Sequence, residues 1–320
     1  MGNEVSTTPA KYGRPAYHVK PVSCKKQDTD FTLNHSTTKL RRSNETNLSN
    51  TLNKSVPIAY QIASMSSMVV SIEGNIGSGK STILRILKHN PEFKAIQQKL
   101  MRPVILIDEP VKEWDTIRDK EGTILEKFYG DPKKYAFSFQ IMAYATRFQA
   151  IQTAIQQNPN SIIITERCLE TDKHVFARML YESGDISPID YEIYKRCYDA
   201  FSTIVTDKHI YINTRPMVCY QRVQKRSRQG EDCIEFSYLS ECGEVHDEWL
   251  NSKENVHTID GNIEFEHDSN EIKHILTEIV RILNPNIDNQ YLEEIIEDVY
   301  RASQPITTEE MKFMTIHSCS

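Results

Sequence analysis

Apolar residues gather along this chain in five short runs that are separated by longer amphipathic stretches. Each run is rich in Val or Ile, and each is followed at once by a charged or polar residue. The runs are Met68–Ile72, Val104–Ile107, Ser161–Thr165, His209–Ile212 and Val256–Ile259. Near-continuous apolar strands separated by helices are typical of a parallel sheet that is covered on both faces. We therefore predict an α/β fold built on a parallel five-stranded sheet.

The intervening stretches predict helices. Apolar residues recur at helical spacing over Phe137–Gln157, which predicts one long helix. Shorter helices are expected at Thr82–Leu87, directly after the first strand, and at Tyr291–Ala302. Ligands of such sheets bind at the carboxyl ends of the strands, so the polar residues that follow each strand mark the expected site.

Composition divides the chain into three parts. Residues 1–64 are rich in Ser, Thr and Asn, carry nine Lys and Arg against four Asp and Glu, and show no hydrophobic period, which predicts a disordered N-terminal extension. Residues 65–283 carry the alternating strands and helices and form the predicted folded domain. Residues 284–320 are expected to add a C-terminal extension with one helix and a frayed end.

The overall composition excludes several classes of protein. Hydrophobic residues at 39% and charged residues at 26% are ordinary for a soluble protein, and no apolar run is long enough to span a membrane. A net charge of −6 argues against a general nucleic-acid-binding role. The seven cysteines are scattered without a Cys-x-x-Cys pair, which favours free thiols in a reducing compartment. We therefore expect a cytoplasmic protein without a nucleic-acid or integral-membrane partner.

The N-terminal extension leaves two other destinations open. Met1–Ser6 matches the pattern for N-myristoylation. The basic, Ser- and Thr-rich composition would also suit a mitochondrial transit peptide, although Glu4 and the weak amphipathic period argue against one. A solvated extension without a targeting role is the interpretation that we favour.

A glycine-rich loop separates the first predicted strand from the first predicted helix. Its sequence, Gly74-x-x-x-x-Gly79-Lys80-Ser81, is the P-loop pattern in its proper strand–loop–helix context, in which backbone N–H groups cradle a phosphate chain. We expect Lys80 to reach the terminal phosphates and the Ser81 hydroxyl to hold Mg²⁺. A turn that merely opens a helix is the alternative. The residues expected to bind the nucleoside triphosphate are Gly74, Asn75, Ile76, Gly77, Ser78, Gly79, Lys80, Ser81 and Thr82.

Acidic residues follow the second and third strands. Glu109, in Asp108-Glu109-Pro110, would face the P-loop and can act as general base for a hydroxyl that attacks the γ-phosphate. Glu166 can hold Mg²⁺ through water, and Arg167 can orient the base or a phosphate. Taken alone, Glu109 would be a surface acid and Glu166–Arg167 an exposed ion pair. The other motifs that converge on the same site favour the catalytic interpretation.

Three arginines lie close together after the fourth strand. Arg222 and Arg226 share one helical face, and Arg228 follows at the helix end, near Gly230. Guanidinium groups stabilise the negative charge that spreads over the oxygens of a transferred phosphoryl group. With the adjacent glycine, they predict a mobile arginine-rich lid, and a solvated basic helix is the alternative.

Together these motifs resemble the deoxynucleoside kinase family, which contains deoxycytidine, deoxyguanosine and deoxyadenosine kinases and mitochondrial thymidine kinase. The resemblance covers about residues 68–283 and implies a P-loop kinase of nucleotide salvage that uses ATP and Mg²⁺ to phosphorylate the 5′-hydroxyl of a deoxynucleoside. It also implies a homodimer packed through long helices such as Phe137–Gln157. Cys168 and Tyr135 depart from the usual Ser and the common Trp without touching a catalytic role. The matching segments are Ile72–Thr82, Glu109–Trp114, Asp131–Gln140, Glu166–Cys168 with Asp172, the three arginines, Tyr238–Leu239 and His246–Leu250.

The resemblance also implies a role for each matching residue. Glu109 would be the base for the 5′-hydroxyl, and Arg167 would orient it. Tyr129 and Glu231 would hold the 3′-hydroxyl, and Gln140 would hydrogen-bond the edge of the nucleobase. The remaining contacts would come from Phe139, Phe176 and Trp114 around the nucleobase, from Arg222, Arg226 and Arg228 in the lid, and from Asp260 and Gly261 near the adenine of ATP.

Two charged residues bear on which nucleoside is used. Arg147 lies two helical turns after Gln140, so both face one pocket, and Asp172 matches the position that partners this arginine in the deoxycytidine and deoxypurine kinases. A carboxylate accepts from an exocyclic amino group, and a guanidinium donates to a ring nitrogen or to O6. With Ala143 they favour deoxyadenosine, deoxyguanosine or deoxycytidine over thymidine, with purines slightly ahead. A purely structural ion pair is the alternative.

Two other functions remain in view. A nucleoside monophosphate kinase such as thymidylate kinase shares the P-loop architecture, but it needs an arginine at the acceptor where a nucleoside kinase needs a base. A non-catalytic family member that serves as an assembly subunit would tend to lose the phosphate loop or the base. Here Lys80, Ser81, Glu109 and Arg167 are all present.

Overall fold

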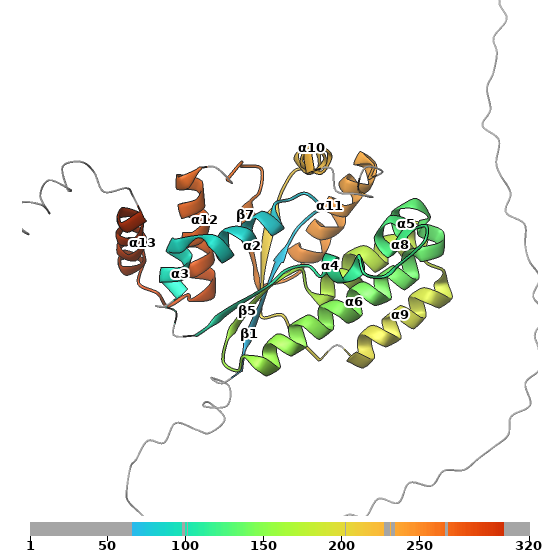
Figure 1. Ribbon diagram of the computed structural model, residues 1–320, viewed down its shortest axis with the longest axis horizontal. Helices are drawn as coiled ribbons and strands as arrows, with labels where there is room; N and C mark the ends of the chain where they lie inside the picture. The colour runs from blue at the N-terminus through green and yellow to red at the C-terminus, as the bar shows by residue number, and fades with distance from the viewer. Residues whose placement is uncertain are drawn as a thin grey trace, which may run out of the picture. The chain divides into compact units, whose positions relative to one another are not determined.

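Five strands of the computed structural model form one sheet in the order β2-β5-β1-β6-β7 (Figure 1). All four neighbouring pairs are parallel. The strands are β1 (Met68–Glu73), β2 (Val104–Ile107), β5 (Ile162–Glu166), β6 (Lys208–Asn213) and β7 (Val256–Asp260). The predicted α/β fold with a parallel five-stranded sheet is confirmed, and every predicted strand end agrees to within one residue.

The structure describes residues 66–303 apart from 98–99, 101, 202, 227–230, 232–233 and 266–267. The extension predicted at residues 1–64 and the frayed end predicted within 284–320 lie outside the described residues, so both stay predictions. Within the described ranges, no helix combines the length and the apolar character needed to cross a membrane.

Strand register brings the carboxyl ends of neighbouring strands level with one another. Ile72 of β1 pairs with Glu166 of β5, and Ile107 of β2 pairs with Thr165 of β5. The P-loop and the residues that follow β2 and β5 therefore leave the sheet at the same edge. This is the edge at which parallel α/β sheets bind their ligands.

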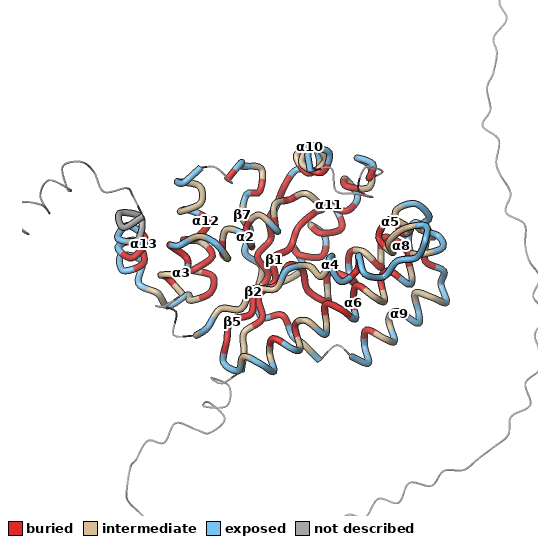
Figure 2. Tube along the Cα trace, in the orientation of Figure 1, coloured by how far each residue is buried: buried red, intermediate tan, exposed pale blue. Residues whose placement is uncertain are grey.

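Four helices cover one face of the sheet, and their apolar stripes form the largest core cluster. Val70 and Ile72 of β1 are fully buried there, against Leu84 and Ile279 among others. Figure 2 shows the buried strands at the centre and helices whose outer surfaces are exposed. The four helices are α2 (Lys80–His89), α3 (Pro91–Gln97), α12 (Ser269–Leu283) and α13 (Asn289–Ser303).

The opposite face is covered by α6 (Pro132–Gln157), α11 (Phe236–Asn251) and one bent segment (Figure 1). In that segment a turn of π-helix, η1, lies between two short α-helices, and such turns are frequent at functional sites. Tyr211 of β6 packs here against Val175 of η1 and Trp249 of α11. The segment comprises α7 (Leu169–Thr171), η1 (Asp172–Ala177) and α8 (Arg178–Glu182), and α9 (Pro188–Phe201) packs on α6.

Shorter elements surround the carboxyl edge of the sheet. A capping box starts α5, because the Thr123 side chain accepts from the N–H of Glu126 and the Glu126 carboxylate accepts from the N–H of Thr123. Phe128 of α5 then packs on Phe139 of α6. These elements are α4 (Val111–Trp114), the hairpin β3 (Arg118–Asp119) and β4 (Gly122–Thr123), α5 (Ile124–Gly130) and α10 (Pro216–Arg226).

Local capping explains where the long helix begins. The prediction placed its start at Phe137, whereas α6 starts at Pro132. Asp131 accepts a hydrogen bond from the N–H of Lys134 at 3.3 Å, and proline at the first helical position needs no partner for an N–H group. The predicted start was therefore wrong by one turn and more, because apolar spacing marks the buried face and not the cap.

The helix predicted near the C-terminus is present as α13. Its side chains Leu292, Ile295 and Ile296 are buried in the same core cluster as those of α3 and α12. This helix is therefore packed on the folded domain. The predicted domain boundary at residue 283 stays a prediction.

Candidate active site

The loop between β1 and α2 packs closely against its neighbours at two glycines. Gly77 has φ +82° and Gly79 has φ +107°, values that L side chains rarely adopt. A Cβ atom on Gly77 would lie 2.6 Å from the carbonyl oxygen of Cys219, and one on Gly79 would lie 3.0 Å from the ring of Phe265. Both glycines are required by backbone conformation and by packing, as the P-loop pattern predicts.

Lys80, the first residue of α2, is buried beneath this loop. Its Nζ donates to the carbonyl oxygens of Gly74 and Asn75 at 3.1 and 2.6 Å. Burial and the charge of Arg167 lower the pKa of Lys80 to about 8. A phosphate that enters the loop would therefore stabilise the charged form of Lys80.

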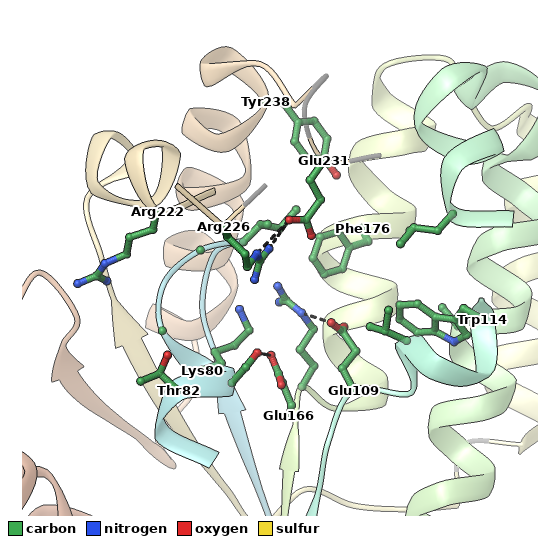
Figure 3. A pocket seen from close by; sticks show the side chains of 18 of the residues that line it. Lys80, Thr82, Glu109, Trp114, Glu166, Phe176, Arg222, Arg226, Glu231 and Tyr238 are labelled. Carbon is green, nitrogen blue, oxygen red and sulfur yellow. Dashed lines mark hydrogen bonds and ion pairs between the residues drawn. The ribbon is translucent and has the colours of Figure 1, made fainter. Parts of the chain in front are cut away.

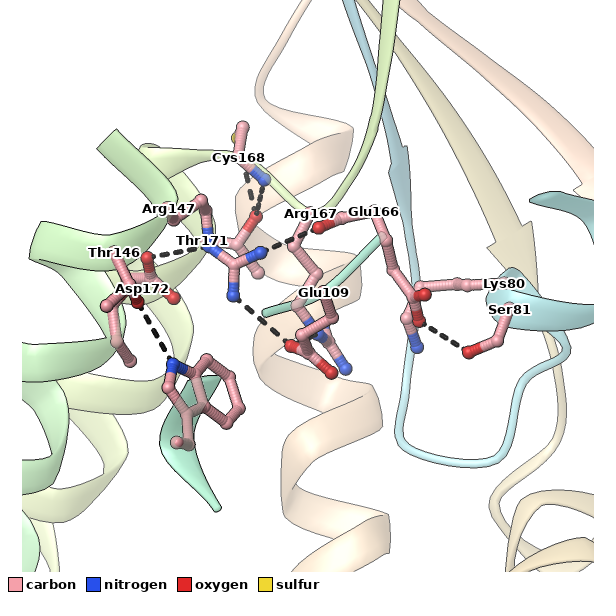
Figure 4. Close-up of polar contacts among 12 residues, drawn as sticks. Lys80, Ser81, Glu109, Thr146, Arg147, Glu166, Arg167, Cys168, Thr171 and Asp172 are labelled. Atoms are coloured by element: carbon pink, nitrogen blue, oxygen red, sulfur yellow. Dashed lines mark hydrogen bonds and ion pairs between the residues drawn. The ribbon is translucent and has the colours of Figure 1, made fainter. Parts of the chain in front are cut away.

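Ser81 and Glu166 offer a pair of oxygen ligands beside the loop (Figure 4). Ser81 Oγ donates to Glu166 Oε1 at 2.8 Å. Burial and the charge of Glu109 raise the pKa of Glu166, against the opposing effect of Lys80. Hydroxyl and carboxylate oxygens are the ligands that Mg²⁺ prefers, and a cation would relieve the buried charge. The two residues fit a magnesium site.

Glu109, two residues after the end of β2, lies between two arginines (Figure 4). Its Oε1 is 3.5 Å from Arg167 Nε and 3.2 Å from Arg147 Nη2. Burial by itself would raise the pKa of this carboxyl group, but the charges of Arg167, Arg147 and Lys80 outweigh burial and hold the pKa below its ordinary value. Glu109 is therefore ionised at neutral pH, as a proton acceptor must be.

Each of the three guanidinium nitrogens of Arg147, on α6, donates one hydrogen bond within the protein (Figure 4). Nε donates to Asp172 Oδ2 at 3.0 Å, Nη1 to the carbonyl oxygen of Glu166 at 2.7 Å, and Nη2 to Glu109 at 3.2 Å. Burial opposes the charge, but Asp172 and Glu109 outweigh it and raise the pKa of Arg147. Arg147 and Asp172 thus form the ion pair that was the alternative to nucleobase binding. Both residues also line the cavity, so the two roles are compatible.

Arg167 begins the turn after β5 in an unusual backbone conformation. Its φ is +64°, and its N–H donates to the carbonyl oxygen of Ile72 at 3.0 Å. Strain of this kind in a residue other than glycine costs about 1–3 kcal/mol and clusters at functional sites. The guanidinium lies over the ring of Phe176, 4.6 Å from its centroid, with Glu109 beside it.

A cavity of about 630 Å³ joins these groups, a size within the usual range for small-molecule sites. One part of it is aromatic: Phe139 stacks on Phe128 with centroids 4.6 Å apart, and Trp114 meets Phe139 edge-on at 5.3 Å. Gln140 also lines the cavity, and its buried amide oxygen has no hydrogen-bond partner among the described residues. Apolar walls with an available amide suit a flat ring with a polar edge.

Most of the predicted site residues line this one cavity (Figure 3). They are Ile76, Gly77, Gly79, Lys80, Ser81, Thr82, Glu109, Trp114, Tyr129, Phe139, Gln140, Arg147, Glu166, Arg167, Asp172, Phe176, Arg222, Arg226 and Glu231. The predicted residues Gly74, Asn75 and Ser78 of the P-loop, and Asp260 and Gly261 after it in the chain, are not among the lining residues. Arg228 lies outside the described residues.

The two described arginines of α10 have different partners (Figure 3). Arg222 donates from Nη1 to the carbonyl oxygen of Gly261 at 2.7 Å and from Nη2 to that of Ile263 at 3.0 Å. Arg226 forms an ion pair with Glu231, with Nε 3.1 Å from Oε2. Arg222 thus ties α10 to the chain after β7, while Arg226 meets a residue predicted to hold the sugar. The arginine-rich lid stays a prediction.

The segment after β7 reaches the cavity through residues that sequence reasoning missed. Ile263, Glu264 and Phe265 line it, whereas Asp260 Oδ1 accepts from the N–H of Asn262 at 2.9 Å. An isolated aromatic residue among polar neighbours was the signal available for Phe265, and nothing local shows that it meets Gly79. The adenine contact predicted for Asp260 and Gly261 stays a prediction.

Comparison with known proteins places these motifs in context. The family model described as deoxynucleoside kinase matches residues 70–285. A probable deoxycytidine kinase of fowlpox virus is 33% identical over 220 residues, which cover 66% of this chain and 86% of that protein. Deoxycytidine kinase 2 of Gallus gallus is 31% identical over 67% of this chain and 89% of its own length. A mitochondrial deoxyguanosine kinase of Xenopus laevis is 27% identical over 58% of this chain and 73% of its own.

Proposed function

The chain belongs to the deoxynucleoside kinase family, and from that premise we propose that it transfers the γ-phosphate of ATP to the 5′-hydroxyl of a deoxynucleoside. The protein is thus a kinase, and the resemblance drawn from its motifs is confirmed. One observation carries the finer proposal. The Glu109 carboxylate, held ionised by two arginines, lines the same cavity as Lys80 of the P-loop.

In this mechanism Glu109 takes the proton of the 5′-hydroxyl as the oxygen attacks phosphorus. Arg167, 3.5 Å from Glu109, orients the carboxylate. Its positive charge would also lie near the negative charge of the phosphoryl group during transfer. Phosphoryl transfer asks the protein mainly for positioning and electrostatic stabilisation, and a cavity with Lys80, Arg167 and Arg226 on its walls supplies both.

The donor phosphates would lie on the P-loop, with Lys80 at the terminal phosphates. Ser81 and Glu166 would hold Mg²⁺, their oxygens being adjacent at 2.8 Å. Held by these two residues, Mg²⁺ would neutralise part of the negative charge of the phosphates. ATP as the donor, Mg²⁺ as the cation and closure of an arginine-rich lid over them belong to the proposal.

The acceptor would lie between the aromatic side chains. Phe139 and Phe176 would hold the nucleobase between them with Trp114 beside it, and the available amide of Gln140 would meet its polar edge. Tyr129 and Glu231 would hold the 3′-hydroxyl. In the described structure Glu231 already accepts from Arg226, so the hydroxyl would share or displace that contact.

The charged pair beside Gln140 favours a nucleobase with an amino group or an oxo group. Asp172 can accept from an exocyclic amino group, while Arg147 can donate to O6 or a ring nitrogen. Both are 2% exposed and lie in the cavity wall, where burial of an unmatched methyl against them would be unfavourable. We therefore favour deoxyadenosine, deoxyguanosine or deoxycytidine over thymidine, with purines slightly ahead.

The acceptor also separates this proposal from its alternatives. A nucleoside monophosphate kinase would bring a second phosphate toward Glu109, whose ionised carboxylate would repel it. An assembly subunit without activity would not need the set of charged groups that line this cavity. Neither alternative is favoured by an observation of its own.

A substrate panel tests the proposal directly. Steady-state rates for the four deoxynucleosides with ATP and Mg²⁺ should show transfer to at least one of deoxyadenosine, deoxyguanosine and deoxycytidine, and thymidine as the best substrate would refute the argument from Arg147 and Asp172. Glu109→Gln should lower kcat by about 100- to 10,000-fold while ATP binding is retained. Glu113→Gln is the matched control, because Glu113 is exposed on α4.

Assembly and location are proposed on narrower grounds. Helix α9 exposes Ile189, Ile193 and Phe201 to solvent at 74%, 43% and 57%, and an apolar helix face of this kind suits a homodimer interface beside α6. Light scattering of Ile193→Lys against the unaltered protein tests it, with a monomer expected for the variant. A cytoplasmic location rests on the scattered thiols, and cell fractionation tests it against mitochondrial import and N-myristoylation.

A further inference from the structure

A buried histidine outside the predicted site contacts the arginine that serves the proposed base. His246 of α11 has no exposed surface, and its Nε2 lies 3.2 Å from Nη1 of Arg167. Its other ring nitrogen, Nδ1, lies 2.6 Å from the carbonyl oxygen of Cys242. His246 is not among the residues that line the cavity, and sequence reasoning gave it no role.

The partners determine where the imidazole carries its proton. A carbonyl oxygen only accepts, so Nδ1 must be the donor to Cys242, and a guanidinium only donates, so Nε2 must present its lone pair to Arg167. The ring is therefore neutral with its hydrogen on Nδ1. Burial, together with the charges of Arg167 and Lys80, lowers the pKa of His246 well below its ordinary value, which agrees with this assignment.

We propose that His246 is a positioning residue that holds the Arg167 guanidinium in the orientation from which it acts on Glu109. The proposal deepens the proposed kinase function and rests on it. Arg167 spends one nitrogen on His246 and another on Glu109, and the ring of Phe176 lies against the guanidinium face, 4.6 Å away, and meets His246 edge-on at 6.0 Å. The guanidinium is thus held from three directions.

A neutral acceptor suits this position for an electrostatic reason. A carboxylate in place of His246 would pair with Arg167 and offset the positive charge that Glu109 feels. A neutral imidazole orients the guanidinium through one hydrogen bond and does not offset the positive charge of Arg167. The ionised state of Glu109 depends on that charge. Among the neighbouring cations, Arg167 lowers the pKa of Glu109 more than Arg147 or Lys80 does.

Helix α11 also links this contact to the phosphate loop. Near the start of the helix, the carbonyl oxygen of Leu239 accepts from Asn75 Nδ2 at 2.7 Å. Two turns further along the same helix stands His246. Helix α11 is therefore hydrogen-bonded to the P-loop at one point and to Arg167 at another. It fixes the position of the phosphate-binding side of the cavity relative to the side that holds Glu109.

Kinetics of paired variants test the proposal. His246→Leu removes the acceptor and should lower kcat by about 100-fold while the KM for ATP changes little. Gln places an oxygen close to the position of Nε2, so His246→Gln should recover most of the lost rate. His257→Gln is the control, because His257 is exposed on β7. Thermal unfolding of each variant verifies that it is folded.

The pH profile separates positioning from simple structural support. In His246→Leu the displaced Arg167 should hold the pKa of Glu109 down less strongly, so the acid limb of kcat/KM should move to higher pH. The charged groups that face Glu109 are Arg167, Arg147, Lys80, Glu166 and Asp172. Of these, only Arg167 contacts the substituted side chain. An unchanged rate in His246→Leu, or equal losses in the Leu and Gln variants with an unmoved profile, would overturn the proposal.

A second measurement needs no turnover. Long-range ¹H–¹⁵N correlation spectra of the unaltered protein should show the imidazole of His246 neutral and protonated on Nδ1 at about pH 6 to 8. A hydrogen on Nε2, or a charged ring, would exclude the bond to Arg167 whatever the enzyme phosphorylates. If the spectra agree but no deoxynucleoside is phosphorylated, then the proposed function fails and the contact stands.

Discussion

Glu109 and Arg147 form an ion pair, with Oε1 3.2 Å from Nη2, although 38 residues separate them in the chain. The same guanidinium holds Asp172 at 3.0 Å. The proposed general base and the residues proposed to choose the nucleobase are therefore one electrostatic unit. A substitution meant to change the preferred nucleobase should also change the proton affinity of Glu109.

The buried pair of Arg147 and Asp172 should show strong energetic coupling. Arg147→Met leaves Asp172 buried without its cation, which should cost about 3–5 kcal/mol of unfolding free energy. The double variant Arg147→Met/Asp172→Leu should lose clearly less than the sum of the two single changes, because no unpaired charge remains. Urea unfolding of the four proteins measures the coupling, and additive losses would contradict it.

The protein should take up a proton at Lys80 when it binds ATP at mildly basic pH. The pKa of Lys80 in the free protein is about 8, and phosphates beside its ammonium group would raise that pKa. Below that pH, Lys80 is already protonated in both states and contributes no uptake. As the pH rises above it, uptake should appear and affinity should fall.

Calorimetry in buffers of different ionisation enthalpy measures this uptake. Lys80→Arg keeps the positive charge at every relevant pH, so its proton uptake should vanish. Equal uptake in the two proteins would assign the proton to another group.

The hydroxyl of Ser81 should matter for the metal more than for the fold. Ser81→Ala removes one of two adjacent oxygens and should raise the Mg²⁺ concentration for half-maximal activity by about tenfold or more. Ser81→Thr keeps the hydroxyl and is the matched control. Since Ser81 is exposed, thermal unfolding of both variants should match that of the unaltered protein. Equal metal requirements in Ala and Thr variants would remove Ser81 from the site.

The close packing of the P-loop makes Gly79 intolerant of a side chain. Gly79→Ala adds a methyl 3.0 Å from Phe265 at a φ of +107°, and the strain should cost about 1–3 kcal/mol and weaken ATP binding. Gly130→Ala is the control, because a Cβ there meets nothing within 4 Å and no positive φ is involved. Titration with ATP and thermal unfolding compare the two. Similar behaviour of both variants would show that the contact with Phe265 is unimportant.

Particular elements show how far sequence reasoning reached. Each strand was predicted to within one residue, since the strands are mostly apolar and each ends at, or just before, a charged or polar residue. The P-loop was equally plain, because its glycines serve a local backbone shape. The start of α6 was missed, since Asp131 and Pro132 act as a cap that lies outside the apolar period.

Side chains were harder to predict wherever their partner is remote. The phosphate contact expected of Arg222 stays a prediction, and nothing local indicated that its guanidinium donates to the backbone of the chain after β7. Phe265 and His246 received no role, although one packs on Gly79 and the other contacts Arg167. Nothing within a few residues of either side chain indicates its partner.

The sequence by itself determined the strands, the phosphate loop and the family. Apolar runs and loop glycines act on the conformation of a few neighbouring residues, so their effect can be read locally. Only the tertiary structure decided which charges meet. Arg147 reaches Glu109 across 38 residues and Arg167 reaches His246 across 79, and both contacts depend on strand order and on how each helix is turned on the sheet. The pKa of Glu109 depends on its burial and on the charges of Arg167, Arg147 and Lys80, and is therefore a property of the folded chain alone.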